Sequence, residues 1–156
     1  DLVGRGVTTR QQLGIQGGSN GGLLMGIMYT QYPDDFGAVL CQVPLLNMGR
    51  FHTMLAGHSW IAEYGNPEDS QQWQFIRTFS PVHLFDPDRS YPSLMLTTST
   101  KDDRVHPGHA RSLGYLAEAA GKPVLYFENI EGGHGGAADN QKRAHNQDLW
   151  WAFLWR

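Results

Sequence analysis

The sequence predicts an α/β fold in which a parallel sheet of about four strands is flanked by helices. Two observations lead to this prediction. Short apolar segments with the character of strands alternate with longer helical segments, which is typical of a parallel sheet covered by helices. A glycine-rich turn, "GGSNGG" at residues 17–22, joins the first strand to the first helix. Because no repeat or low-complexity tract interrupts the pattern, the 156 residues are expected to form one unit.

The strands follow from apolar runs bounded by turn residues. They are expected at residues 13–17, 36–43, 91–98 and 123–127. The second is apolar along nearly its whole length, as in a strand that is covered on both faces. A long excursion separates the second strand from the third, whereas each of the other two connections contains one helix.

The helices are recognised by their length and by the residues at their ends. They are expected at residues 22–32, 107–120 and 139–155. The first is apolar on most sides, which indicates burial, and Pro33 ends it. The second has Pro107 in its first turn and Gly121 just beyond its end, and Asp139 is expected to cap the third. The aromatic residues near the end of the third helix are expected to lie in the core: Trp150, Trp151, Phe153 and Trp155.

Composition restricts the class of protein. A hydrophobic content of 40% with 12% aromatic residues indicates a globular domain and excludes disorder. The formal net charge is only -3 and the basic residues form no runs, so no nucleic-acid partner is expected. The single cysteine, Cys41, cannot form an internal disulfide, and its apolar neighbours predict a buried core position.

The ends of the chain bear on its location and completeness. No apolar stretch is long enough to span a bilayer and the N-terminus has no signal-peptide pattern, so no membrane contact is expected. A cytoplasmic location is expected, with a periplasmic or secreted one left open. The chain opens on Asp1 rather than on methionine and stops inside an apolar helical pattern, so we expect it to be part of a longer protein.

The glycine-rich turn has the pattern of a nucleophile elbow. Gly17, Ser19 and Gly21 match G-x-S-x-G, in which the serine occupies a strained strand-to-helix turn and its hydroxyl projects from the sheet edge. Side chains two residues before and after the serine would collide across such a turn, so both positions are expected to require glycine. The Asn20 N–H, at the positive end of the helix, would face an oxyanion. The alternative is a plain glycine-rich turn that cradles a phosphate.

A serine hydroxyl needs a base to remove its proton. In folds that contain a nucleophile elbow, the acid and then the histidine follow the serine in the sequence. Asp102 and Asp103 come directly after the third strand, and His134 lies in a glycine-rich loop after the fourth. Loops that follow parallel strands open at the same edge of the sheet, so these side chains are expected to meet Ser19. Alternatively, His134 is a surface histidine and the aspartates form a solvated turn; at most one aspartate can orient the imidazole.

Four stretches together resemble the prolyl oligopeptidase family of serine peptidases. They are "GGSNGGLL", "GHSWIAEYGNPED", "TKDDRVHPGHA" and "GGHGG", in this order, and the likeness covers nearly the whole chain. The resemblance implies an α/β-hydrolase fold with Ser19 as nucleophile and His134 as base. It selects the first aspartate of "DDRV", Asp102, as the acid, and it gives the Asn20 N–H as an oxyanion donor.

The resemblance also implies a pocket for a substrate proline. Trp60 and Tyr64 match the aromatic pair of that pocket, where the tryptophan stacks on the proline ring, and Val105 matches another lining residue. Arg104 matches an arginine that holds a substrate carbonyl. A flat ring without an N–H suits stacking on an aromatic face. The alternatives are a core role for Trp60 and a surface ion pair between Arg104 and Asp103.

The expected function is therefore that of a serine peptidase that hydrolyses short peptides after proline, with no metal or organic cofactor. An esterase or aminopeptidase on the same fold is one alternative, because a fold does not determine the substrate. An inert scaffold is another. Five further histidines show no spacing typical of metal ligands: His52, His58, His83, His109 and His145. No role is assigned to His106.

Residues 1–156 are expected to form only the C-terminal half of the hydrolase domain. The resemblance implies upstream strands, a second oxyanion donor and a β-propeller, none of which is in this sequence. Because losing one oxyanion donor costs about 10²–10³ in turnover, the chain alone is expected to have weak or no activity. The strand at residues 13–17 would be a bare edge, and self-association through it is expected.

Overall fold

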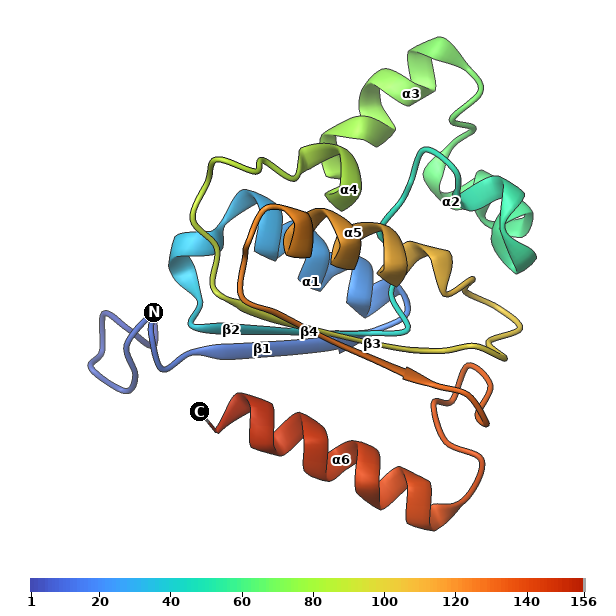
Figure 1. The fold of residues 1–156 in the computed structure, drawn as a ribbon. Coiled ribbons are helices and arrows are strands. Elements are labelled where there is room, and N and C mark those ends of the chain that lie inside the picture. The colour runs from blue at the N-terminus through green and yellow to red at the C-terminus, as the bar shows by residue number, and fades with distance from the viewer. Residues whose placement is uncertain (156) are drawn as a thin grey trace.

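The computed structural model describes residues 1–155 as a parallel sheet with helices on both faces (Figure 1). The strands lie in sequence order and all pair in parallel: β1 (Gly14–Gly18), β2 (Ala38–Gln42), β3 (Ser93–Ser99) and β4 (Val124–Asn129). The predicted fold class is confirmed. The predicted bounds differ from the observed ones by one or two residues.

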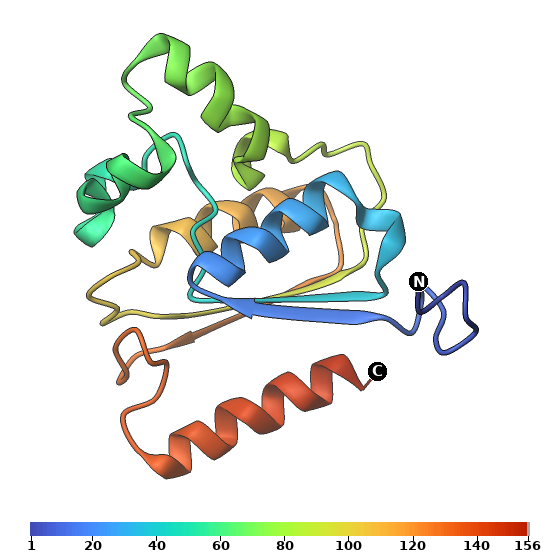
Figure 2. The same ribbon diagram turned by 180° about the vertical axis from the view of Figure 1, so that it is seen from behind.

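Three longer helices cover the sheet. Helices α1 (Asn20–Gln31) and α5 (Gly108–Ala119) lie against one face, and α6 (Asn140–Leu154) lies against the other, as both views show (Figure 1, Figure 2). The Asp139 side chain accepts a hydrogen bond from the backbone N–H of Lys142, so it caps α6 as predicted. Within residues 1–155, no helix has both the length and the apolar character needed to cross a membrane.

The excursion between β2 and β3 consists of short helices that the sequence pattern did not predict. They are η2 (Phe51–Thr53), η3 (Leu55–Trp60), α2 (Ile61–Tyr64), α3 (Ser70–Ile76), η4 (Arg77–Phe79) and α4 (Pro81–Leu84); a further short turn, η1 (Pro33–Asp35), precedes β2. Each is too short to show a periodic apolar pattern. The excursion lies beyond α1 and α5, on the side away from the sheet (Figure 1).

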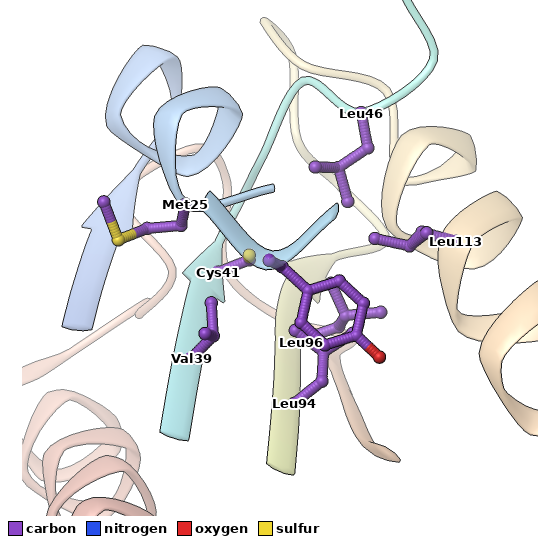
Figure 3. Close-up of a cluster of buried hydrophobic side chains, with 8 residues drawn as sticks. Met25, Val39, Cys41, Leu46, Leu94, Leu96 and Leu113 are labelled. Carbon is purple, nitrogen blue, oxygen red and sulfur yellow. The ribbon is translucent and has the colours of Figure 1, made fainter. Parts of the chain in front are cut away.

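The core is divided by the sheet into layers. Side chains from β2 and β3 pack with side chains from α1, α5 and the start of the excursion in one cluster (Figure 3), which includes Met25, Val39, Cys41, Leu46, Leu94, Leu96 and Leu113. Leu40, Met95 and Phe153 form another cluster toward α6. Because Val39, Leu40 and Cys41 are all fully buried, β2 is covered on both faces and Cys41 is a core residue, as predicted.

The prediction that the aromatic end of α6 lies wholly in the core is wrong. Phe153 is buried, whereas Trp151 and Trp155 have 63% and 90% of their surface exposed. Helix α6 packs on the sheet along one side only. Residues four apart lie on the same side of a helix, and this pair lies largely open to solvent near Gly14 of β1.

The turns that follow β1, β3 and β4 all lie at the carboxyl edge of the sheet. In both views the two chain ends lie at the opposite edge (Figure 1, Figure 2). This arrangement places three loops from distant parts of the sequence side by side.

A buried histidine connects α5 to the start of the excursion. The Nδ1 atom of His109 accepts hydrogen bonds from the backbone N–H groups of Leu46, at 3.3 Å, and Asn47, at 3.0 Å. The His109 side chain is fully buried. Burial, aided by the nearby His106, lowers the pKa of His109 from 6.5 to about 4. The neutral ring is therefore the form that the folded chain requires.

This histidine makes folding stability depend on pH. Below a pH of about 6.5 the unfolded chain binds a proton at His109 that the folded chain does not. The free energy of unfolding therefore decreases as the pH is lowered from about 6.5 to about 4. Between about pH 7 and about pH 5 the loss from His109 is about 2 kcal/mol. Urea unfolding at fixed protein concentration measures it. The His109→Asn variant, whose Oδ1 can accept the same N–H groups without titrating, should lose less; an equal loss in both proteins would contradict the assignment.

Candidate active site

Ser19 occupies a strained turn between β1 and α1. Its backbone φ is 58° and its ψ is -117°, a conformation that residues other than glycine rarely adopt. The Ser19 N–H donates to the Gln42 carbonyl at 2.8 Å, and the Ser19 carbonyl accepts from the Leu23 N–H at 3.1 Å. The sheet on one side and the helix on the other thus hold the strained turn in place. The hydroxyl does not cap α1, so it is available for other contacts.

Of the two glycines expected to be required around Ser19, the structure restricts only Gly17. A Cβ atom at Gly17 would lie 2.4 Å from the Gly21 carbonyl oxygen, so Gly17 must lack a side chain as predicted. A Cβ atom at Gly21 would have no neighbour within 4 Å, and the prediction for Gly21 is therefore wrong. The collision is one-sided because it involves the backbone of Gly21 rather than a second side chain. Gly22 is the other restricted position, since its Cβ would lie 2.6 Å from Pro44.

His134 and Ser19 are brought together at the carboxyl edge of the sheet. The Nε2 atom of His134 lies 3.1 Å from Ser19 Oγ, although 115 residues separate the two in the sequence. The His134 side chain is partly exposed, at 20%. The serine hydroxyl is therefore within hydrogen-bond distance of an imidazole that is open to solvent.

Asp102 orients the other side of the imidazole. Its Oδ2 and Oδ1 atoms lie 2.8 and 3.1 Å from His134 Nδ1. Asp102 Oδ1 also accepts the backbone N–H groups of Arg104, at 2.9 Å, and Val105, at 2.8 Å. The carboxylate is fully buried, so these donors replace its hydration and fix its position. Asp103, by contrast, is exposed.

Asn20 and Tyr64 are linked directly. Asn20 is the first residue of α1, so its N–H has no acceptor within the helix. The Asn20 side-chain oxygen accepts a hydrogen bond from the Tyr64 hydroxyl at 2.7 Å. Burial raises the pKa of Tyr64 above its ordinary value, with a further contribution from Glu63. The tyrosine is thus a neutral donor that joins α2 to the residue next to Ser19.

The other pocket candidates lie around one apolar cluster beside α1. Trp60 and Tyr64, both partly buried, pack against a cluster that contains Leu23 and Val105. Trp60 has a role in core packing while part of its ring remains exposed. Val105 is 1% exposed and belongs to the buried cluster against which the aromatic residues pack. Among residues 1–155, Arg104 forms no ion pair, so the alternative pairing with Asp103 is not observed, and its side chain is exposed.

Three buried polar residues at this site were missed by the sequence analysis. Ser99, Asn129 and Asn146 contact the loop that carries His134. The spacing of Asn146 could have revealed it, because Trp150 and Phe153 follow at i+4 and i+7, on the side of α6 that faces the sheet. Ser99 and Asn129 end their strands and carry no comparable signal. Within the described part of the chain, no group of three or more potential metal ligands gathers.

The arrangement is suited to nucleophilic catalysis. His134 can take the Ser19 proton as Oγ attacks a carbonyl carbon, and Asp102 can stabilise the imidazolium that forms. The N–H groups at the start of α1 can stabilise negative charge that develops on the carbonyl oxygen.

Comparison with known proteins gives concordant results. A model of the prolyl oligopeptidase family matches residues 1–156. An uncharacterized peptidase of Sinorhizobium fredii is 49% identical over 100% of the chain and 22% of its own length. The prolyl endopeptidase of Elizabethkingia meningoseptica is 36% identical over 95% of the chain and 22% of its own length. The solved structure of a post-proline cleaving enzyme from Rickettsia typhi superposes with a TM-score of 0.92 at 38% identity, covering 98% of the chain and 23% of that structure.

The two outer glycines of the elbow should respond differently to the same substitution. Gly17→Ala places its Cβ against the Gly21 backbone, which cannot move without distorting α1, and should lower the free energy of unfolding by several kcal/mol. Gly21→Ala meets open space inside a helix and should be neutral or stabilise by about 0.5–1 kcal/mol. Urea unfolding of the two variants tests this. Equal destabilisation by both would contradict the one-sided collision.

Proposed function

Because the chain belongs to the prolyl oligopeptidase family, we propose that it carries the nucleophile, base and acid of a serine peptidase that cleaves short peptides after proline. The observation that supports this most directly is the continuous contact from Ser19 Oγ through His134 to Asp102. Ser19, His134 and Asp102 come from three loops at one edge of the sheet. If His134 were only a surface histidine and Asp102 only part of a solvated turn, nothing would require these side chains to contact one another.

The proposed reaction proceeds through an acyl-enzyme. Ser19 Oγ attacks the carbonyl carbon of the proline residue while His134 Nε2 takes the hydroxyl proton, and the same proton passes to the leaving amine. Asp102 holds the ring with Nδ1 protonated and Nε2 free to accept. The Asn20 N–H donates to the oxyanion. Water then attacks the acyl-serine, with His134 acting as base, and the peptide acid is released.

Recognition of proline is assigned to the aromatic cluster beside Ser19. We propose that the exposed part of the Trp60 ring stacks on the pyrrolidine ring of the substrate, with Tyr64 beside it and Val105 supporting the wall from behind. The Tyr64–Asn20 hydrogen bond ties this wall to the oxyanion donor. The exposed Arg104 guanidinium is proposed to hold a substrate carbonyl, since its side chain is not engaged in an ion pair within residues 1–155.

The catalytic unit is proposed to be larger than this chain. The chain spans about a fifth of the length of the curated relatives that it matches, 22% in both cases. We propose that residues 1–156 are the C-terminal half of the hydrolase domain and that upstream segments supply a second oxyanion donor and further strands. The isolated chain is therefore expected to have little or no peptidase activity.

The first test is covalent labelling of Ser19 in the full-length protein. A serine-directed fluorophosphonate should label Ser19, and hydrolysis of a prolyl amide should fall by a factor of about 10⁴ or more in Ser19→Ala. Mass spectrometry of the labelled peptide and release of the amine leaving group measure the two effects. Ser59→Ala, an exposed serine in the excursion, is the matched control and should behave as wild type.

Two results would contradict this function. A full-length protein that does not label at Ser19 would favour an inert scaffold. Labelling at Ser19 with turnover of simple acyl esters but not of prolyl amides would favour an esterase on the same fold, a candidate supported by the Ser19–His134–Asp102 contacts alone.

The isolated 156-residue chain is expected to self-associate through β1. Within residues 1–155 this strand pairs only with β2, and a groove of about 590 Å³ lies beside it, lined by Gly14, Trp151, Ala152, Leu154 and Trp155. Pairing with a second copy would satisfy the free strand edge and cover the exposed tryptophans. Sedimentation velocity should show a dimer or larger species, and Gln16→Lys should shift it toward monomer. The control Leu125→Lys, on the other edge strand, should not; a monomeric wild-type chain would contradict the proposal.

A further inference from the structure

The loop that presents His134 has almost no side chains with which to hold itself in place. It connects β4 to α6, and glycines occupy residues 132, 133, 135 and 136. Glycine contributes no packing and has the largest conformational freedom of any residue. Gly136 adopts a φ of +74°, which favours glycine at that position. The imidazole therefore depends on contacts from outside the loop for its position.

Two asparagines from different elements converge on one carbonyl of this loop. Asn129, the last residue of β4, and Asn146, on α6, each donate a side-chain N–H to the Gly136 carbonyl oxygen at 2.6 Å. Their exposed fractions are 9% and 5%. A carbonyl oxygen has two lone pairs, so it can accept both hydrogen bonds. Because it has no hydrogen to donate, each asparagine must turn its side-chain nitrogen, and not its oxygen, toward Gly136. The Gly136 carbonyl is thereby saturated two residues after His134.

The other end of the loop is held by the end of β3. The Ser99 hydroxyl, which is fully buried, donates to the Gly132 carbonyl and lies 3.1 Å from the Asn129 carbonyl. The Asn129 side-chain oxygen accepts the Glu131 N–H at 3.1 Å. The Ser99 carbonyl in turn accepts the Asp102 N–H at 3.2 Å. Ser99 thus connects the loop of the base with the loop of the acid.

Packing beneath the loop cannot replace these hydrogen bonds. A cavity of about 190 Å³ lies under it, with His134, Gly136, Asn129, Asn146 and Trp150 among its lining residues. A side chain next to a cavity has no partner atoms on that side, so dispersion contacts do not define its position. The directional bonds to Gly132 and Gly136 therefore restrain the loop where packing does not.

We propose that Asn146, together with Asn129, is a positioning residue that fixes His134 between Ser19 and Asp102. This inference rests on the proposed peptidase function. Neither asparagine touches the reacting atoms; each acts through the Gly136 carbonyl. The amide is suited to the task because it is not ionised at any ordinary pH, so the anchor remains while His134 gains and loses a proton. Through Asn146, α6 on the far face of the sheet becomes part of the catalytic arrangement.

The test replaces the donating amide by a carboxylate of the same shape. In the full-length protein, Asn146→Asp loses the N–H donor and places an anion beside a carbonyl oxygen. The expected result is a kcat lower by about 10- to 100-fold, the range found for residues that orient a reacting group, with KM little changed. The matched control is Gln147→Glu, the same amide-to-carboxylate change at the next residue of α6, where the side chain is exposed. It should leave kcat unchanged.

A second measurement distinguishes positioning from a merely structural role and does not require turnover. The proton on His134 Nδ1 that bonds to Asp102 should give a low-field proton NMR resonance in wild type and in Gln147→Glu. This resonance should broaden or disappear in Asn146→Asp. Asn146→Ala, which removes the donor without adding charge, should give the same two effects and serves if the aspartate variant does not fold.

The outcomes separate this inference from the proposed function. If wild type neither labels at Ser19 nor turns over, the proposed function fails, while loss of the resonance in the Asn146 variants would still support positioning. If wild type is active and folded Asn146 variants keep both the wild-type kcat and the wild-type resonance, the positioning role is overturned.

Discussion

The structure depends on one constraint: Ser19 Oγ, the imidazole of His134 and the buried carboxylate of Asp102 must lie in a line of hydrogen bonds. Ser19 and His134 are 115 positions apart in the sequence, and Asp102 and His134 are 32 positions apart. Local structure therefore cannot bring them together. A parallel sheet can, because every strand ends at the same edge and delivers its following loop there. The four strands thus hold three loops close enough for the side chains of Ser19, His134 and Asp102 to form hydrogen bonds.

Backbone hydrogen bonds hold both Ser19 and Asp102 in place. Ser19 is strained, and the strain is offset because its N–H belongs to the β1–β2 ladder and its carbonyl begins α1. Asp102 is fully buried, and its cost of burial is offset by two backbone N–H groups and by the imidazole. In both cases the backbone, rather than a neighbouring side chain, holds the reacting group.

His134 is held differently from its two partners. Its loop is rich in glycine and lies above a cavity, so buried polar side chains replace packing. Such a loop can approach Ser19 closely without steric conflict, and its position is set by a few directional bonds instead of many weak contacts. Under the proposed positioning role, α6 on the far face of the sheet contributes to the placement of His134 through Asn146.

The sequence by itself determined the strands, the three longer helices and the candidate Ser19, because apolar periodicity and the G-x-S-x-G pattern are local properties of the chain. His134 followed from its place after the fourth strand, and the resemblance to the prolyl oligopeptidase family selected Asp102 over Asp103. The short helices of the excursion, the exposed side of α6 and the freedom at Gly21 were decided only by the tertiary structure. So were the convergence of Asn129 and Asn146 on Gly136 and the bond between Tyr64 and Asn20. Each of these depends on which distant segments pack against one another. A single polar residue forms no periodic pattern, so its hydrogen-bond partner cannot be predicted from the sequence around it.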